Sequence, residues 1–218
     1  MGESFYTSEK GKAAFEELTK ETKDQGVFHR AFLNVVTQAG GGAMELLHAA
    51  TGSNVSSIDI DGYFTSDYDH YKLIYSVYGA TGNTDTQARI MQGGSVITAD
   101  NYWFAGMAWY YDGSTSQAST NVGFNTNKWG SSSTDNIADS EYPTTGEMLF
   151  SNPLSTSQNT TMTTTSIGYN SGSPPNAIRV WNYAGTYISP STATSGISFH
   201  YDGGNIYGTI RLYGMKNS

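Results

Sequence analysis

Cysteine is absent from this chain of 218 residues, and charged side chains are scarce. Without cysteine the chain has neither a disulfide framework nor a thiolate zinc site, and the sequence does not fix a redox compartment. Charged residues make up 14% of the sequence, against about 25% in ordinary soluble domains. Low charge together with 25 glycines and 16 tyrosines is typical of short strands joined by many turns, so we expect a mainly β protein.

Long apolar runs are also missing. No segment approaches the roughly 18 residues that a membrane-spanning helix needs, and the first residues lack the apolar core of a secretion signal, so we expect no membrane insertion. Lys and Arg number 11 against 19 Asp and Glu, which gives a net charge of -8, and the basic residues form no stripe. Binding to nucleic acid requires clustered positive charge, so nucleic acid is not an expected partner.

Contiguous enzyme signatures are absent as well. The sequence has no Gly-x-Ser-x-Gly elbow, no GxxxxGK[ST] phosphate loop, no HExxH and no GxGxxG that opens a helix. We therefore predict a protein that is not an enzyme, with no catalytic residues and no cofactor. A polysaccharide-cleaving glycosidase stays open as an alternative, because a pair of carboxylates needs no contiguous motif. Its candidate carboxylates are Asp59, Asp61, Asp67, Asp69, Glu141 and Glu147.

The first 50 residues are richer in charge than the rest, and positions 1–40 hold 5 of the 11 basic residues. Thr7 and Ser8 are suitable caps for a helix over about residues 8–24, where good helix formers dominate. Gln25-Gly26 is a plausible stop, and a second short helix is expected after it. Three glycines at 40–42 break the helical pattern and predict a linker, after which residues 44–50 favour one more helical turn.

Apolar residues at helical spacing give this N-terminal segment one hydrophobic face. We predict that residues 1–50 form a helical anchoring or oligomerisation segment, although the same face would serve equally to pack on the chain's own β domain. No sustained heptad is present, so a coiled coil is not expected. The candidate docking residues on this face are Phe15, Leu18, Phe28, Phe32 and Val35.

From Val55 onward, apolar and polar residues alternate with a period of two, which is the signal of half-buried strands. In the segment from Gly208 to Gly214, the alternation predicts that Ile210 and Leu212 point inward while the residues between them point outward. We expect an antiparallel β-sandwich or jelly roll over residues 55–218. The nine expected strands are 58–60, 72–78, 87–90, 102–111, 146–151, 161–169, 178–183, 196–201 and 208–213.

Two sets of residues could bind a ligand. Asp67, Asp69 and His70 place oxygen and nitrogen ligands close together, but the calcium-loop pattern is not completed, so we interpret them as turn residues and predict no metal site. Aromatic side chains on strands divide between core and surface, whereas Trp129 and Tyr142 fall in a polar segment that is predicted to be a loop. We therefore predict Trp129 and Tyr142 as ligand-contact residues.

Two blocks of sequence carry a resemblance to a known family. The first runs Ile58-Asp-Ile-Asp61 and then Phe64-Thr-Ser-Asp-Tyr-Asp-His-Tyr-Lys-Leu-Ile74. The second runs from Ile197 through a Gly-Asn-Ile turn to Gly-Thr-Ile-Arg-Leu-Tyr-Gly214. In this order they resemble the opening strands and the closing hairpin of a β-sandwich module in virion proteins of tailed bacteriophages, of the tail-fibre or capsid-decoration type. The loops between Tyr111 and Ile178 match no pattern of that family.

The resemblance implies a non-enzymatic virion surface protein that is assembled in the host cytoplasm, as a capsid decoration or a tail-fibre component. It also implies homo-oligomers, most often trimers, and contact with other virion proteins, for which the N-terminal segment is the expected docking element. A carbohydrate-binding module that recognises a host surface glycan is the alternative, and a depolymerase is a further one. The resemblance supplies no functional residues.

Overall fold

The computed structural model describes residues 44–80, 86–111, 114, 116–130, 143–169, 178–189, 191–201 and 204–216. The two predicted helices before residue 40 and the glycine linker at 40–42 lie outside these residues. The described part is built of strands: β1 (Met44–Val55), β2 (Ser57–Asp61), β3 (His70–Gly79), β4 (Thr86–Gln92), β5 (Ser95–Val96), β6 (Tyr102–Tyr111), β7 (Ser116–Thr126), β8 (Trp129–Gly130), β9 (Thr144–Ser151), β10 (Thr160–Tyr169), β11 (Ile178–Tyr187), β12 (Gly196–Tyr201) and β13 (Ile206–Met215).

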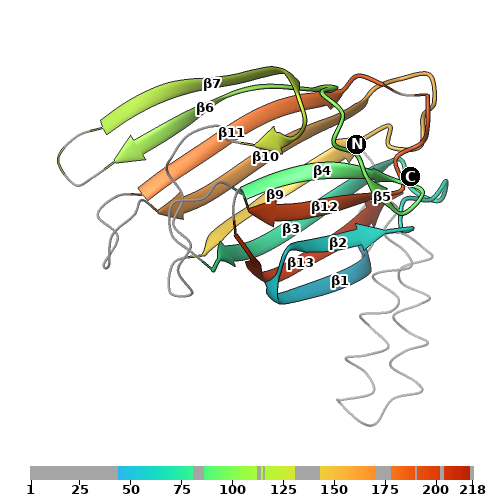
Figure 1. The fold of residues 1–218 in the computed structure, drawn as a ribbon, viewed down its shortest axis with the longest axis horizontal. Coiled ribbons are helices and arrows are strands. Elements are labelled where there is room, and N and C mark those ends of the chain that lie inside the picture. Colours follow the sequence, from blue (N-terminus) through green and yellow to red (C-terminus); the bar gives the residue numbers. More distant parts are fainter. Residues whose placement is uncertain are drawn as a thin grey trace, which may run out of the picture. The chain divides into compact units, whose positions relative to one another are not determined.

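These strands form two antiparallel sheets in a sandwich-like arrangement, which confirms the predicted mainly β class (Figure 1). The large sheet has the strand order β1-β13-β3-β9-β10-β11-β6-β7. The small sheet has the order β2-β12-β4-β5, and β8 also pairs with β4. Among the described residues, no helix has the length and the hydropathy of a membrane span.

The core lies between the two sheets and follows from the alternation of side chains along the strands. In β3, Tyr71, Leu73, Tyr75 and Val77 are buried, whereas the residues that alternate with them are only half-buried. In β13, Ile210 and Leu212 are fully buried and Arg211 is exposed, as the period of two predicts. Such inward rows from both sheets enclose one hydrophobic cluster.

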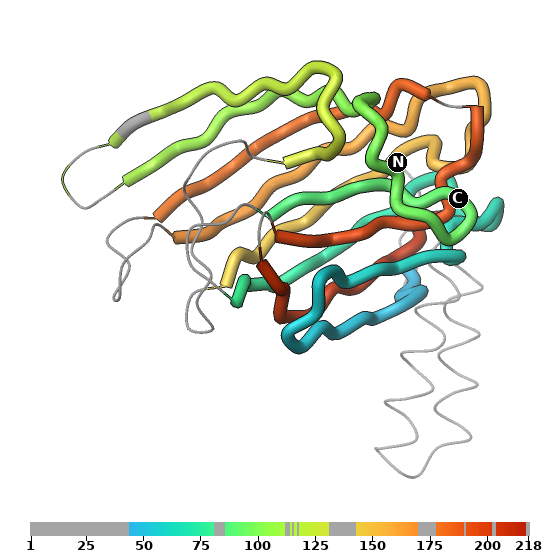
Figure 2. The backbone as a smooth tube through the Cα atoms, viewed as in Figure 1, coloured from blue at the N-terminus to red at the C-terminus, as the bar shows by residue number. Residues whose placement is uncertain are grey.

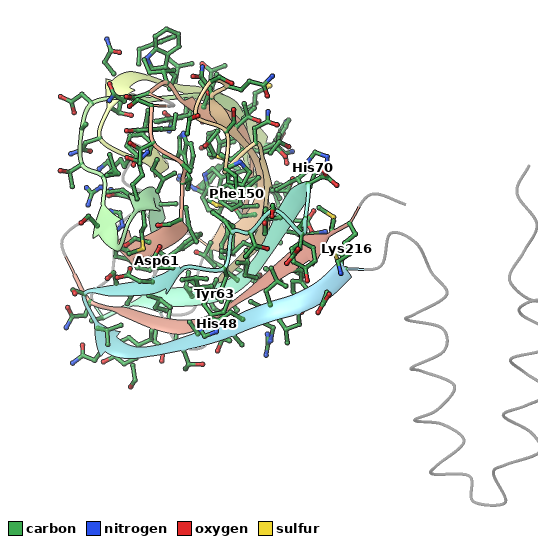
Figure 3. The ribbon with its side chains drawn as sticks, turned by 90° about the vertical axis from the view of Figure 1, so that its right-hand side faces the viewer. His48, Asp61, Tyr63, His70, Phe150 and Lys216 are labelled. Atoms are coloured by element: carbon green, nitrogen blue, oxygen red, sulfur yellow. The ribbon has the colours of Figure 1, made fainter. Side chains whose placement is uncertain are left out.

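The prediction of a helical turn at residues 44–50 is wrong, because these residues belong to β1. β1 pairs antiparallel with β13, from Met44 opposite Met215 to Val55 opposite Ile206. Met, Leu and Ala favour a helix locally, but pairing with β13 satisfies their backbone groups in the sheet and outweighs that preference. The ring of His48 in β1 stacks on the ring of Tyr63, with ring centres 4.3 Å apart. Figure 3 labels both side chains.

A register shift in β1 separates Gly52 from Val55, and a polar clasp holds it in place. Asn54 has a positive φ of 59° in this shift, a conformation that asparagine tolerates better than most residues. The Asn205 side-chain amide donates to the carbonyl oxygen of Asn54 at 3.2 Å and to its side-chain oxygen at 3.1 Å. The clasp therefore joins the end of β1 to the start of β13.

β6 and β7 form the far end of the large sheet, as the backbone trace in Figure 2 makes plain. β7 was not predicted as a strand, because its sequence is mostly small and polar residues rather than β-branched or aromatic ones. It pairs with β6 over most of its length, from Tyr111 opposite Ser116 to Tyr102 opposite Thr126. The very short β5 and β8 were missed for a different reason, since two residues carry no period.

Candidate functional site

The outer face of the large sheet, which is the face turned away from the core, is the candidate site. Along each strand, the side chains on this face alternate with side chains that point into the core. Over β10, β11, β6 and β7 this face carries no Asp, Glu, Lys, Arg or His. Its largest exposed apolar side chains there are Trp103, Met107, Trp109, Tyr111, Val122, Phe124 and Ile178. An exposed apolar surface of this kind is typical of a contact site.

The Trp103 hollow is an aromatic-walled depression of the outer face, lined by residues of β6, β7, β10 and β11. Trp103 and Phe124 form its wall, with ring centres 5.5 Å apart and planes at 66°. The Trp103 indole N–H donates to Asn125 Oδ1 at 2.9 Å, which fixes the ring while leaving it 39% exposed. The hollow has a volume of about 370 Å³, and its other lining residues include Ala105, Thr161, Thr163 and Ala184.

Strand register explains why a hollow forms at this place. Ala105 of β6 lies opposite Ala184 of β11, and Ala184 lies opposite Thr163 of β10. The small side chains of these two alanines leave a depression beside the much larger Trp103 and Phe124 rings. Threonines of β10 line the opposite side of this depression. The hydroxyls of Thr161 and Thr163 bond to no other described side chain or backbone group.

The chemistry of the Trp103 hollow suits an uncharged ligand with one flat apolar face. The exposed aromatic rings can stack on such a face, and threonine hydroxyls can donate or accept hydrogen bonds at its edge. Asn125 satisfies the indole N–H, so the ring offers its apolar surface rather than a polar atom. An anion would find no charged partner on this part of the outer face.

A second hollow lies further along β6, around Trp109. It has a volume of about 520 Å³ and is lined by Trp109, Tyr111, Ala118, Ile178 and Val180 together with neighbouring polar residues. Trp109 is 42% exposed and Tyr111 is 51% exposed. The outer face thus carries two aromatic patches, one near each end of β6.

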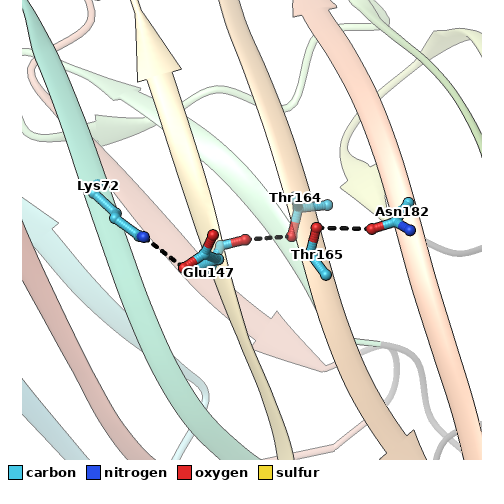
Figure 4. A network of polar contacts seen from close by, with 5 residues as sticks. All are labelled: Lys72, Glu147, Thr164, Thr165 and Asn182. Atoms are coloured by element: carbon cyan, nitrogen blue, oxygen red, sulfur yellow. Dashed lines mark hydrogen bonds and ion pairs between the residues drawn. The ribbon is translucent and has the colours of Figure 1, made fainter.

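Towards β3 and β13 the outer face becomes charged. Lys72 Nζ lies 2.6 Å from Glu147 Oε2, and this ion pair bridges β3 and β9. Figure 4 shows that the pair is followed by threonine contacts on β10, where Thr164 Oγ1 donates to the Glu147 carbonyl oxygen and Thr165 Oγ1 donates to Asn182 Oδ1. Because both charged side chains remain partly exposed, the pair contributes at most about 1 kcal/mol.

Tyrosines near the start of β3 have raised pKa values. The Tyr68 hydroxyl donates to Glu45 Oε2 at 2.7 Å, and this hydrogen bond is the main reason why the pKa of Tyr68 rises to about 12. Tyr71 bonds to the backbone of Thr65, and its burial raises its pKa. The Tyr71 contacts are structural, since its ring is fully buried in the core.

The residues considered for a metal site do not converge. His70 Nδ1 lies 3.1 Å from Ser151 Oγ, and Asp67 Oδ2 accepts from Thr65 Oγ1 at 3.4 Å within a local turn. Asp61, a candidate glycosidase carboxylate, accepts a hydrogen bond from Ser195 Oγ at 2.5 Å. Within the described residues, no three His, Asp or Glu side chains are grouped so that they could hold a metal ion.

Of the two predicted ligand-contact residues, Trp129 does not lie on the outer face, and Tyr142 lies outside the described residues. Trp129 is fully buried rather than in an exposed loop, because β8 pairs with β4 and turns the ring into the core. Its indole N–H donates to the Thr186 carbonyl oxygen at 3.2 Å, and its ring meets Tyr102 edge to face. Tyr142, Glu141 and all five predicted docking residues (Phe15, Leu18, Phe28, Phe32 and Val35) lie outside the described residues.

The alternation along β6 could have identified Trp103 and Trp109 as one face, since they are six residues apart on one strand. Phe124 could not have been found in this way, because β7 has no clear strand signal. Comparisons of the chain with protein-family models, curated proteins and solved structures found no match. The structure therefore establishes the fold class of the described residues, which is mainly β with two antiparallel sheets in a sandwich-like arrangement.

Proposed function

We propose that this chain is a non-enzymatic virion surface protein of the tailed-bacteriophage type, whose β-sandwich presents the outer face of its large sheet as a contact surface. The observation that carries the contact role is the charge-free, aromatic part of that face over β10, β11, β6 and β7. A chain with net charge -8 that nonetheless keeps such a surface uncharged is suited to apolar contact with a partner.

The sequence blocks behind the phage resemblance support the proposal by their positions. The first block supplies β2 and the start of β3, and the second supplies β12 and β13. β12 pairs with β2, and β13 pairs with β3. Each strand pair thus joins one block to the other, so the resemblance concerns one packed unit that includes part of each sheet.

The non-enzymatic part of the proposal is consistent with the roles of the described carboxylates. Glu147 is paired with Lys72, and Asp61 accepts a hydrogen bond from Ser195. Asp67 takes part in a turn. The depolymerase alternative stays open, and reducing-end release from a host polysaccharide that is lost on Glu141→Gln or Glu147→Gln would support it against the proposal.

Location on a virion is tested with antibodies raised against the recombinant chain. Phage particles from the source strain are purified on a density gradient and examined by immunogold electron microscopy and by mass spectrometry. We expect gold label at a fixed position on intact particles and peptides of this chain in the particle band. Peptides found only in the soluble fraction would overturn the virion assignment.

A second candidate function is the binding of a neutral glycan, and the Trp103 hollow favours it. A pyranose ring has an apolar face that stacks on aromatic side chains and hydroxyls around its rim, which matches the Trp103 wall and the Thr161 and Thr163 hydroxyls. A glycan array followed by calorimetry with the best neutral oligosaccharide tests this function. We expect Trp103→Ala to abolish binding.

The matched control for the glycan test is Trp109→Ala, because Trp109 lies on the same strand and the same face and is similarly exposed. Retained binding in this control would assign the ligand to the Trp103 hollow. Equal loss in both variants would indicate that the whole face is involved. No binding by the native chain to any neutral glycan would leave contact with a protein as the function of the outer face.

A further inference from the structure

β7 is an edge strand of the large sheet. Among the described strands it has β6 as its only neighbour, and no other described strand pairs with the side of its backbone that faces away from β6. Its regular part runs from Ser116 to Phe124 and ends at a register shift, where Asn125 has a positive φ of 53°. A long open edge is a template for pairing with another chain.

The sequence of β7 lacks the residues that usually prevent an edge strand from pairing with another chain. Residues 116–126 contain no Lys, no other charged residue and no proline. The strand is also poorly covered on its faces: Thr120 and Val122 of the outer face are exposed, and so is Ser119, which points to the opposite side. One strand with a single neighbour and little burial is only weakly stabilised within one copy.

The side chains of β7 are complementary to a second, antiparallel copy of β7. A two-fold axis at Asn121 would place residues whose numbers sum to 242 opposite each other. On the outer face this sets Ala118 opposite Phe124, so a small side chain meets a large one, and Thr120 opposite Val122. On the other face Gly123 would lie opposite Ser119.

We propose that two copies of this chain associate through β7, antiparallel and with the two-fold axis at Asn121, so that their large sheets join into one continuous sheet. Each copy carries a net charge of -8, and contact through a strand without charge keeps the negative residues apart. The arrangement also places both Trp103 hollows on one extended outer face, with the two Phe124 rings about 20 Å apart along the paired strands.

The opposite edge of the large sheet fits such pairing less well. β1 carries Glu45 and His48, and two register shifts interrupt its alignment with β13. The β7 pair is isologous, with the same surface used by both copies, which is the commonest form of closed assembly. It predicts a dimer, in contrast with the trimer that the phage resemblance implies.

The mass of the full chain in solution is the first test. Sedimentation or light scattering should give twice the chain mass of 23.5 kDa for the native protein. Val122→Lys should weaken the dimer by about tenfold or more, because an edge lysine opposes strand pairing. Thr163→Lys, on the outer face but in the interior of the sheet, is the control and should leave the dimer intact. Circular dichroism verifies that both variants are folded.

Cross-linking tests the register, and the absence of native cysteine makes single substitutions clean reporters. Asn121→Cys should form a disulfide with itself, because directly opposed Cα atoms lie about 4.5–5.5 Å apart in an antiparallel pair. Ala118→Cys alone and Phe124→Cys alone should not, since residue 118 and its own copy would be about 20 Å apart. A mixture of these two variants should give the mixed disulfide.

Each other result overturns the proposal. A monomeric native chain does so directly, as does a trimer. A dimer that Thr163→Lys disrupts and Val122→Lys does not would place the contact on the open face of the sheet. Disulfide formation by Ala118→Cys alone, without the mixed product, would indicate a different register. None of these outcomes affects the virion proposal, which is tested on particles.

Discussion

The Trp103 indole and the Asn125 side chain are joined by a 2.9 Å hydrogen bond on the outer face of the large sheet. Asn125 combines two roles there. It is the acceptor that holds the Trp103 ring in place, and it adopts a positive φ of 53° at the register shift between β7 and β6. The aromatic wall of the hollow therefore depends on a backbone irregularity in the neighbouring strand.

Substitutions at Asn125 should separate these two roles. Asn125→Gly keeps the backbone conformation and removes the hydrogen bond, so we expect a loss of about 1 kcal/mol in the free energy of unfolding. Asn125→Ala also forces a side chain into the left-handed region, which adds about 1–2 kcal/mol. Urea denaturation measures both. If the glycine variant were the less stable of the two, the backbone role would be refuted.

The four tryptophans should fall into two classes in solution. Trp103 and Trp109 are about 40% exposed (39% and 42%), whereas Trp129 and Trp181 are at most 4% exposed. Acrylamide should therefore quench one part of the fluorescence strongly and leave another part nearly unquenched. Trp103→Phe should reduce the quenched part and Trp129→Phe the protected part, and the reverse pattern would contradict the burial of β8.

The Tyr68–Glu45 hydrogen bond should be visible in a pH titration. The pKa of Tyr68 is raised from 10.0 to about 12, first by that hydrogen bond and then by burial and the charge of Glu45. The folded state thus holds this proton more tightly than the unfolded state does. Its contribution to stability is complete below pH 10 and is lost as the pH rises towards about 12.

Glu45→Gln should lower the pKa of Tyr68 towards its ordinary value, because the amide keeps an acceptor but loses the charge. NMR of ring-labelled tyrosine resolves this one titration from the others. Glu147→Gln is the matched control, since Glu147 pairs with Lys72 and has no bond to Tyr68. An unchanged Tyr68 titration in Glu45→Gln would show that the hydrogen bond does not form in solution.

Gly208 should tolerate substitution poorly. It has a φ of 128°, and an added Cβ would overlap the carbonyl oxygen of Ser76 on the neighbouring β3. Gly62 has a φ of 80°, and nothing lies within 4 Å of its added Cβ. Gly62→Ala should therefore cost only the conformational penalty of about 1–2 kcal/mol. Gly208→Ala should cost more, and thermal unfolding that ranked the two variants the other way would contradict the β13–β3 pairing.

The sequence predicts the core strands well because their burial imposes a period of two. β3, β9, β10, β12 and β13 appear where alternation or apolar residues indicate them. β1 and β7 do not, since their strand state comes from pairing with β13 and β6 rather than from local preference.

The candidate site was less predictable than the fold. Alternation along β6 predicts that Trp103 and Phe104 point to opposite faces of the sheet. Which of the two side chains is exposed to solvent depends on how the two sheets pack together. Trp129 illustrates the same difficulty, because the polar residues around it suggested exposure while its pairing with β4 buries it. The Trp103 hollow depends on three strands in register, and no local pattern specifies it.

The position of β13 in the large sheet has a consequence for how the protein is made. β13 lies between β1 and β3, so the strand nearest the N-terminus in that sheet gains its only described neighbour from residues 206–215. On a ribosome, β1 must wait until nearly all of the β domain has emerged before it can pair. The β domain therefore closes only after its synthesis is complete, and until then β1 is available to chaperones.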